Sequence, residues 1–536
     1  VLTRTPRQLT RDEGINLVVA APGKADLVLH QGLVLGHPGS DSVAISGGVI
    51  VAHGAFADLK PLVGPRTHLV KLAGRTVAPG FIDSHIHFRE AAAAATGVSV
   101  QRCRTVTDLL ADLRLAAGKT PPGNWMRAFG CDEAMMLDNR GPTRAELDHS
   151  VPKNPLRLRH QTLHATWLNS RAIAVLGLEA PDFTPPNGAN MIRDGAGKLT
   201  GLVVGMETWL SDHLPLVTAA ESESRARIMS REMAAAGVTA FTDATTRNGP
   251  VEVEQFAKLA QSNAICQRVS VMIGGQHLDS ADQCDKLARA AGISLAGAKF
   301  MPGYQYDPAG LSRPVRRALE RGLDCAFHVT EIEELEEALA AIESAKAQFS
   351  GPREMPRFRI EHGGIITPDY IDRLMAANVW VVTNPGFIYF RGPKYAAEPG
   401  LVAHLYRARS LKDRNVHLVG ATDAPVTPAK PFAAIVAAVS RTTIDGVALA
   451  PVEALSMPDA FALFTTEAAR LARLDGGVIE PESIADLIVL PRDPSTLTPA
   501  DLMNLTVDIT IVGGRVVYER GRPAIASSDS ADLRSS

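Results

Sequence analysis

Apolar segments that end in polar residues recur through the middle of the chain, and helical patterns follow them. Segments of this kind are 238–243, 297–300, 325–328, 359–362 and 418–423. The stretch 331–348, which follows one of them, is rich in Ala, Leu and Glu and predicts a helix. Strand–helix units repeated over about 390 residues predict a parallel sheet, either open or closed into a barrel.

The two ends of the chain show a different pattern, in which short β-rich runs are separated by glycine. Residues 26–35 and 42–51 share this pattern with residues 485–490 and 507–518. We therefore expect one β-domain assembled from both termini, with the long middle inserted into it. The predicted boundaries are 1–78 and 473–526 for this domain, 79–472 for the middle with insertions at about 90–150 and 175–205, and 527–536 for a disordered tail.

Composition narrows the class of protein. The chain has 536 residues, 46% of them apolar, and a formal net charge of -3 without a Lys/Arg run, so nucleic acid is not an expected partner. No apolar run approaches the roughly 20 residues of a membrane span, and residues 1–14 lack the apolar core of a signal peptide. The five cysteines are scattered, which suits a reducing cytoplasm. We expect a cytoplasmic protein that acts on a small molecule.

Two histidines follow the apolar run 77–82. His85 and His87 are two residues apart, so on a strand both imidazoles point to the same side. Two imidazoles on one side of a strand end make half of a metal site. An isolated pair of this kind occurs often by chance, and its meaning depends on the rest of the chain.

Other polar residues stand at the carboxyl ends of predicted strands. They are His328, His362, Asp423 and Lys299. In a parallel barrel every strand delivers its last residue to the same face, so these side chains would converge with the histidine pair. A buried lysine is costly unless it is paired or neutralised, and reaction with carbon dioxide would turn it into a carbamate that can bridge two cations.

The chain resembles the amidohydrolase superfamily, and within it the YtcJ-like (amidohydrolase 3) branch. The resemblance rests on Gly80-Phe-Ile-Asp-Ser-His-Ile-His, Lys299, His328, Arg359-Ile-Glu-His and Ala421-Thr-Asp. It implies a distorted TIM (β/α)8 barrel with a small β-sandwich domain built from both termini. It also implies two divalent metals per chain, Zn²⁺ by default with Mn or Fe as alternatives. The implied metal ligands are His85, His87, Lys299 in carboxylated form, His328, His362 and Asp423.

This resemblance implies a metal-dependent hydrolase. Water between two cations is acidified to a pKa of roughly 7, which supplies hydroxide at neutral pH. Asp423 would take a proton from it and return the proton to the leaving nitrogen. The expected reaction is cleavage of a non-peptide C–N bond in an amide, formamide, carbamate or cyclic amide.

Glu331 opens an alternative. The run His328-Val-Thr-Glu331 resembles the deaminase branches, in which one metal suffices and the glutamate carries protons to departing ammonia. A carboxylate favoured by the helix dipole at a helix N-terminus explains Glu331 equally well. The presence of Lys299 favours the two-metal reading, since a site with one metal ion needs no bridging ligand. A barrel that has lost catalysis is the third reading, and the complete ligand set argues against it.

Candidate substrate contacts are Arg89, His164, Glu207 and Tyr389. Arg89 completes a His-x-His-x-Arg pattern, and a guanidinium suits bidentate carboxylate binding. His164 matches the usual histidine at the third-strand end of the YtcJ-like branch and is a candidate for contact with the substrate carbonyl. Strand alternation predicts that Glu361 points away from the pocket. The resemblance also allows a homo-oligomer such as a dimer.

Overall fold

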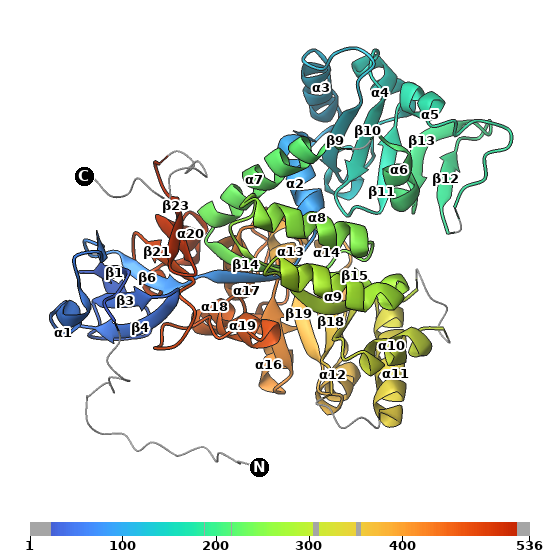
Figure 1. Cartoon of the computed structure of the whole chain (residues 1–536). Helices are drawn as coiled ribbons and strands as arrows, with labels where there is room; N and C mark the ends of the chain where they lie inside the picture. Colours follow the sequence, from blue (N-terminus) through green and yellow to red (C-terminus); the bar gives the residue numbers. More distant parts are fainter. Residues whose placement is uncertain (1–22, 187, 216, 304–309, 350–354, 523–536) are drawn as a thin grey trace.

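The computed structural model describes residues 23–522, except residues 187, 216, 304–309 and 350–354. It contains a barrel in the middle, a β-sandwich on one side of it and a third unit with its own sheet on another side (Figure 1). The predicted tail at 527–536 and the first residues of the predicted domain 1–78 lie outside the described residues.

Eight parallel strands form the barrel, in the order β20-β19-β18-β17-β16-β15-β14-β7. They are β7 (Phe81–Ile86), β14 (Val238–Asp243), β15 (Arg268–Gly274), β16 (Ser294–Phe300), β17 (Cys325–Val329), β18 (Phe358–His362), β19 (Trp380–Thr383) and β20 (His417–Gly420). The edge strands β7 and β20 meet just beyond β20, where the Asp423 amide donates to the His85 carbonyl oxygen at 2.9 Å and the His87 amide donates to the Ala424 carbonyl oxygen at 2.8 Å. The barrel is thereby nearly closed, and the expected distorted TIM barrel is confirmed.

Alternation along each strand decides which side chains line the barrel. On β17, Phe327 and Val329 join the core between the barrel and its helices. Ala326 instead packs inside the barrel against Ala244 and Met272 of neighbouring segments. Residues on the same face of β17 as Ala326, such as His328, therefore project towards the barrel axis.

Helices connect the strands and cover the outside of the barrel (Figure 1). They are α7 (Ala219–Ala235), α8 (Pro250–Gln261), α9 (Ala281–Ala290), α10 (Ser312–Glu320), α11 (Ile332–Gln348), α12 (Pro368–Ala376), α13 (Gly386–Phe390), α14 (Gly392–Ala396), α15 (Pro399–Val402), α16 (Ala408–Asp413), α17 (Pro431–Ser440), α18 (Met457–Ala462) and α19 (Thr466–Ala472), with the 3₁₀ helices η3 (Gly275–Ser280) and η4 (Pro451–Glu453). Helix α11 buries Leu335, Leu339 and Ile342, which share one face at helical spacing. Within the described ranges, no helix is long and apolar enough to cross a membrane.

The β-sandwich is built from both ends of the chain, as expected. One sheet has the order β4-β3-β1-β5, and the second, β2-β6-β21-β22-β23, combines strands from both ends. The elements are β1 (Leu27–His30), β2 (Leu33–Val34), β3 (Ser42–Ser46), β4 (Val49–Gly54), α1 (Phe56–Leu59), η1 (Lys60–Leu62), β5 (His68–Lys71), β6 (Thr76–Pro79), β21 (Leu487–Leu490), η5 (Pro494–Thr496), α20 (Pro499–Met503), β22 (Ile509–Val512) and β23 (Arg515–Glu519). Leu29 and Ile45 from the first sheet share a core with Leu487 and Ile511 from the second.

A six-stranded sheet, β12-β13-β11-β10-β9-β8, forms the third unit, which is inserted after α2 (Phe88–Thr96). Its elements are β8 (Val98–Ser99), α3 (Val106–Ala117), β9 (Met126–Cys131), η2 (Glu133–Met135), α4 (Arg144–Ser150), β10 (Leu156–His160), β11 (Ala165–Leu168), α5 (Ser170–Val175), β12 (Asn190–Arg193), β13 (Leu199–Val204) and α6 (Glu207–His213). The structure thus contradicts the prediction of two insertions, at about 90–150 and 175–205, because the segment between them lies at the centre of this same sheet. Short apolar strands look alike in sequence whichever sheet they join.

Candidate metal centre

Three predicted ligands meet at the seam between β7 and the segment after β20. The Nε2 atoms of His85 and His87 lie 3.4 and 3.2 Å from Oδ1 of Asp423. His85 is the last residue but one of β7, and His87 follows the last residue of that strand. Asp423 adopts a left-handed backbone conformation with φ of 59°. This group has the spacing and donor types of a cation site.

Two further histidines stand beside this group. Nε2 of His362 lies 3.1 Å from Nδ1 of His328. The ring centroids of His85 and His362 are 4.9 Å apart, so the two groups of ligands are continuous. These histidines come from β17 and β18, two strands that are far from β7 in the sheet order. Barrel curvature brings them together at the carboxyl end of the strands.

Lys299 on β16 is buried, with 1% of its surface exposed. Burial lowers the pKa of its amine to about 8, against the nearby charges of Glu361 and Asp423, which raise it. Its charge also helps to lower the pKa values of His85, His328 and His362. Lys299 thus lies within electrostatic reach of ligands from three strands.

Unpartnered polar atoms provide a test of whether these residues fit a metal. Nε2 of His85, Nζ of Lys299 and Oδ1 of Asp423 are buried, and none has a hydrogen-bond partner among the described residues. A buried polar atom without a partner costs on the order of 1–3 kcal/mol. Three such atoms in one place, in a set of imidazoles, a carboxylate and an amine, fit divalent metal ions that satisfy them together.

In three of the four imidazoles, the nitrogen that faces away from the centre is held by a partner. Nδ1 of His85 lies 2.5 Å from Oε2 of Glu361. Nδ1 of His87 lies 2.9 Å from the Thr245 hydroxyl, and Nδ1 of His362 lies 2.8 Å from Oδ1 of Asn384. Partners of this kind fix the ring orientation and leave Nε2 for a metal.

Glu361 corrects a sequence prediction, because alternation was expected to point it away from the pocket. It is fully buried and points inward, where the Arg359 guanidinium donates to both of its carboxylate oxygens at 2.7 and 3.1 Å. The physical reason lies in His362, whose φ of 70° takes it out of strand geometry. His362 therefore turns into the centre although its neighbour Glu361 occupies the inward row of β18. The Arg-x-Glu spacing, which places two opposite charges on one strand face, was the available signal.

Charges in the centre favour neutral imidazoles and an ionised carboxylate. Burial, reinforced by Lys299, lowers the pKa of His85 to about 3, so its ring is neutral at neutral pH. Burial disfavours ionisation of Asp423, but the nearby imidazoles of His87, His362 and His85 hold the pKa of this carboxyl well below its usual range. A neutral imidazole and an ionised carboxylate are the protonation states that bind a metal ion.

His164 reaches the centre from a different element than predicted. It lies in the turn between β10 and β11 of the inserted sheet, and so it does not end a third barrel strand. Its ring centroid is 6.0 Å from that of His328, in an edge-on arrangement. Burial lowers its pKa, and the charge of His87 adds to this effect. A neutral imidazole from the inserted unit therefore faces the metal ligands.

The other predicted substrate residues have partners away from the ligand group. Arg89 donates to Gln255 at 2.8 Å and lies 3.6 Å from Glu252, both on α8. Tyr389 packs its ring on that of Phe390, with centroids 5.0 Å apart.

Two predicted carboxylates also have defined surroundings. Glu207 forms ion pairs with Arg157 and Arg159 of the inserted sheet. Glu331 is exposed and is the N-cap residue of α11. Burial and the charges of Glu334 and Glu333 raise the pKa of Glu331. Its position matches the helix-terminus reading of this carboxylate.

Comparison with known proteins places the chain in a family. Residues 68–518 match the model of the amidohydrolase family. An N-substituted formamide deformylase from Arthrobacter pascens is 28% identical over 523 residues, which are 90% of this chain and 95% of that protein. The putative amidohydrolase YtcJ from Bacillus subtilis (strain 168) is 24% identical over 517 residues, 90% of this chain and 96% of that protein.

A solved structure shows the same fold. An uncharacterised metal-dependent hydrolase from Pyrococcus horikoshii superposes with a TM-score of 0.69 at 21% identity, over 88% of this chain and 99% of that one. The family match covers the inserted unit, the whole barrel with its ligand group, and the part of the sandwich from β5 onward. The protein is a metal-dependent hydrolase of C–N bonds other than peptide bonds. The chain belongs to the amidohydrolase family, in its YtcJ-like branch.

Proposed function

We propose that this enzyme hydrolyses a small N-substituted formamide or a closely related amide, with two divalent metal ions held by six side chains. The observation that carries the proposal is the convergence of buried, unpartnered donors from His85, Lys299 and Asp423 beside His328 and His362. The similarity to a formamide deformylase over nearly the full length of both proteins supports the choice of substrate class.

The ligands divide into two groups in this proposal. His85, His87 and Asp423 would hold one ion, His328 and His362 would hold the other, and Lys299 in its carbamate form would be a ligand to both. Carbamate formation joins the neutral Lys299 amine to the carbon of carbon dioxide and releases one proton. Because burial lowers the pKa of Lys299 to about 8, roughly a tenth of the amine is neutral near pH 7, far more than for an exposed lysine.

Bound divalent ions in such a site acidify water and polarise a carbonyl group. The chain's own residues then handle protons and orientation. Asp423 is ionised, so its carboxylate accepts a proton from the attacking water and returns it to the leaving amine. His164 faces the same space from above His328 and donates a hydrogen bond to the substrate oxygen.

Deamination through Glu331 is the alternative, and the position of Glu331 argues against it. Its carboxylate is exposed, and the charged groups that most affect its pKa are Glu334, Glu333 and Glu398 rather than the metal ligands. A proton shuttle needs to lie within hydrogen-bond reach of the reacting atoms.

The test follows the products released from a panel of N-formyl and N-acyl amines by the metal-loaded enzyme. We expect formate or another carboxylate with the free amine, and a loss of roughly 10²- to 10⁴-fold in kcat for Asp423→Asn. Glu331→Gln, as the matched carboxylate control, should retain activity. Ammonia release from an amino-substituted ring compound, lost in Glu331→Gln, would reverse the assignment.

A further inference from the structure

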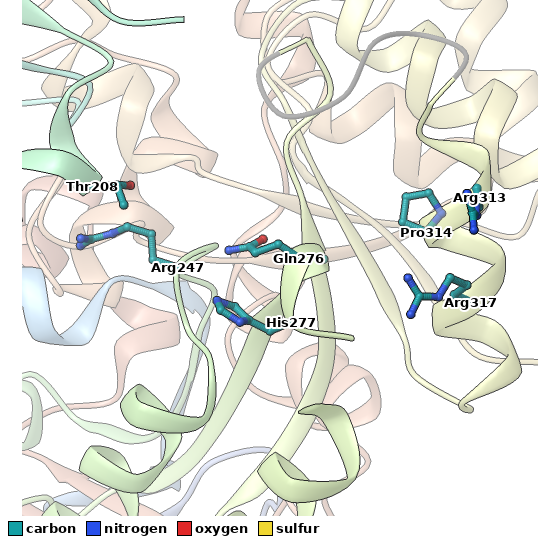
Figure 2. A pocket seen from close by; sticks show the side chains of 8 residues that line it. Thr208, Arg247, Gln276, His277, Arg313, Pro314 and Arg317 are labelled. Atoms are coloured by element: carbon teal, nitrogen blue, oxygen red, sulfur yellow. The ribbon is translucent and has the colours of Figure 1, made fainter. Parts of the chain in front are cut away.

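A cavity of about 830 Å³ lies beside the barrel mouth, between the segments that follow β14 and β15 and helix α10 (Figure 2). Its lining residues are Thr208, Arg247, Gly275, Gln276, His277, Arg313, Pro314 and Arg317. They include three arginines, and none of these described lining residues is acidic. This volume is typical of a small-molecule site.

The inner wall of the cavity and the metal centre share their supporting segments. Arg247 lies two residues after Thr245, whose hydroxyl is 2.9 Å from Nδ1 of His87. Gly275 follows Gly274, which pairs in register with Lys299 across β15 and β16. The segments that line this wall therefore continue directly from those that support the metal ligands.

The outer wall carries positive charge that the protein leaves largely uncompensated. Arg313 and Arg317 are one turn apart on α10. Arg317 pairs with Asp279, which also lies 3.4 Å from Arg321 and is itself mostly exposed. Arg313 has no hydrogen bond or ion pair with any residue that the structure describes. Figure 2 shows the Arg317 side chain extending from α10 towards the side of the cavity where Gln276 and His277 lie.

Arginine is also in slight excess over glutamate at and behind the inner wall. Arg247 is compensated by Glu90 at 2.7 Å. Thr208 of the lining follows Glu207, and that one carboxylate serves both Arg157 and Arg159. Arg247 alone of these charged residues lines the cavity; together with Arg157, Arg159, Glu90 and Glu207 behind the wall, the charges sum to +1. Positive charge on both sides of a partly enclosed space concentrates anions there.

We infer that this cavity binds an anionic group on the substrate, an inference that rests on the proposed function. The substrate is then an N-formyl or N-acyl amine that bears a carboxylate or a phosphonate-type group. Arg313 and Arg317 bind that group, because the guanidinium presents paired donors to anionic oxygens. Gln276 and His277 lie across from them as further hydrogen-bonding groups.

The experiment compares three compounds on the metal-loaded full chain. They are N-formylphenylalanine, its aminophosphonate analogue, and N-formylphenethylamine, which lacks the anionic group. Hydrolysis and calorimetric binding are measured for the wild type, Arg313→Gln and the double variant Arg313→Gln/Arg317→Gln. Arg316→Gln is the matched control, since Arg316 is on the same helix, is exposed and does not line the cavity.

We expect the anionic compounds to bind more tightly than the neutral one. The double variant should weaken their binding roughly tenfold or more, as expected for charge-assisted hydrogen bonds, and Arg313→Gln should weaken it less. The neutral compound should be unaffected in every variant, and Arg316→Gln should match the wild type. Comparing the carboxylate with the phosphonate identifies which anionic group the site prefers.

Equal binding of the neutral and anionic compounds, or no weakening in the double variant, overturns the inference. If the double variant is poorly folded, Arg313→Gln decides the matter, because Arg313 is exposed and has no described partner to lose. Anion-dependent binding without hydrolysis supports the cavity assignment while the proposed function fails. Hydrolysis of the neutral compound alone supports the proposed function while the cavity assignment fails.

Discussion

At the scale of single residues, Glu361 links the metal ligands to the barrel interior. Its carboxylate accepts the His85 Nδ1–H at 2.5 Å while Arg359 holds it from the other side. We expect Glu361→Gln to lower metal affinity roughly 10- to 100-fold, the usual effect of losing such a partner. Metal titration against a competing chelator measures this change.

A surface glutamate serves as the control for that experiment. Glu336 also pairs with an arginine, Arg373, but is half exposed and lies on α11 away from the centre. Glu336→Gln should bind metal as the wild type does. Unchanged affinity in Glu361→Gln would show that the Glu361–His85 contact does not support metal binding.

At this scale, the sequence pattern identified the candidate metal ligands, but it missed the residues that hold those ligands by hydrogen bonds. Lys299 and His328 could be identified from the sequence because each lies in the inward row near the end of an apolar strand. Glu361, Thr245 and Asn384 were not singled out as partners, because a hydrogen bond between distant segments leaves no spacing pattern. The left-handed conformations of His362 and Asp423 also lie outside any strand periodicity.

At the scale of elements, the start of α11 holds the segment after His328. Glu334 is buried and accepts hydrogen bonds from the backbone amides of Thr330 and Glu331 at 2.6 and 3.1 Å. Replacing a capping side chain costs about 0.5–2 kcal/mol, so Glu334→Ala should lower the melting temperature by a few degrees.

Glu333, an exposed neighbour in the first turn of the same helix, is the matched control for this prediction. Glu333→Ala should change stability much less. Thermal unfolding monitored by circular dichroism compares the two variants. Equal melting temperatures would mean that the Glu334 bonds add nothing to the folded state.

At the scale of the whole molecule, the inserted sheet is tied to the loop that follows Asp423. The Gln161 amide donates to the carbonyl oxygens of Pro425, at 3.0 Å, and Val426, and the Gln101 amide donates to that of Pro425 at 3.2 Å. The catalytic candidate Asp423 directly precedes this loop. Docking of the inserted unit should therefore help to position Asp423. The inserted unit was the part of the fold that sequence patterns could not separate from the barrel.

We expect Gln161→Ala to lower kcat/KM about tenfold, since each lost hydrogen bond of this kind costs about 0.5–1.5 kcal/mol. Metal content should stay at the wild-type level. Gln283→Ala, at an exposed position on α9, is the control. Steady-state kinetics with the best substrate of the panel measures the effect, and a wild-type kcat/KM in Gln161→Ala would exclude the positioning role.

The metal content of the purified protein tests the central claim most directly. Elemental analysis of the wild type should give two divalent ions per chain, and Lys299→Met should retain fewer, because the variant lacks the amine that becomes the bridge. The same analysis after labelling with isotopic bicarbonate should show a carbamate in the wild type alone. A wild-type protein that binds no divalent ion under metal-replete conditions would contradict the account.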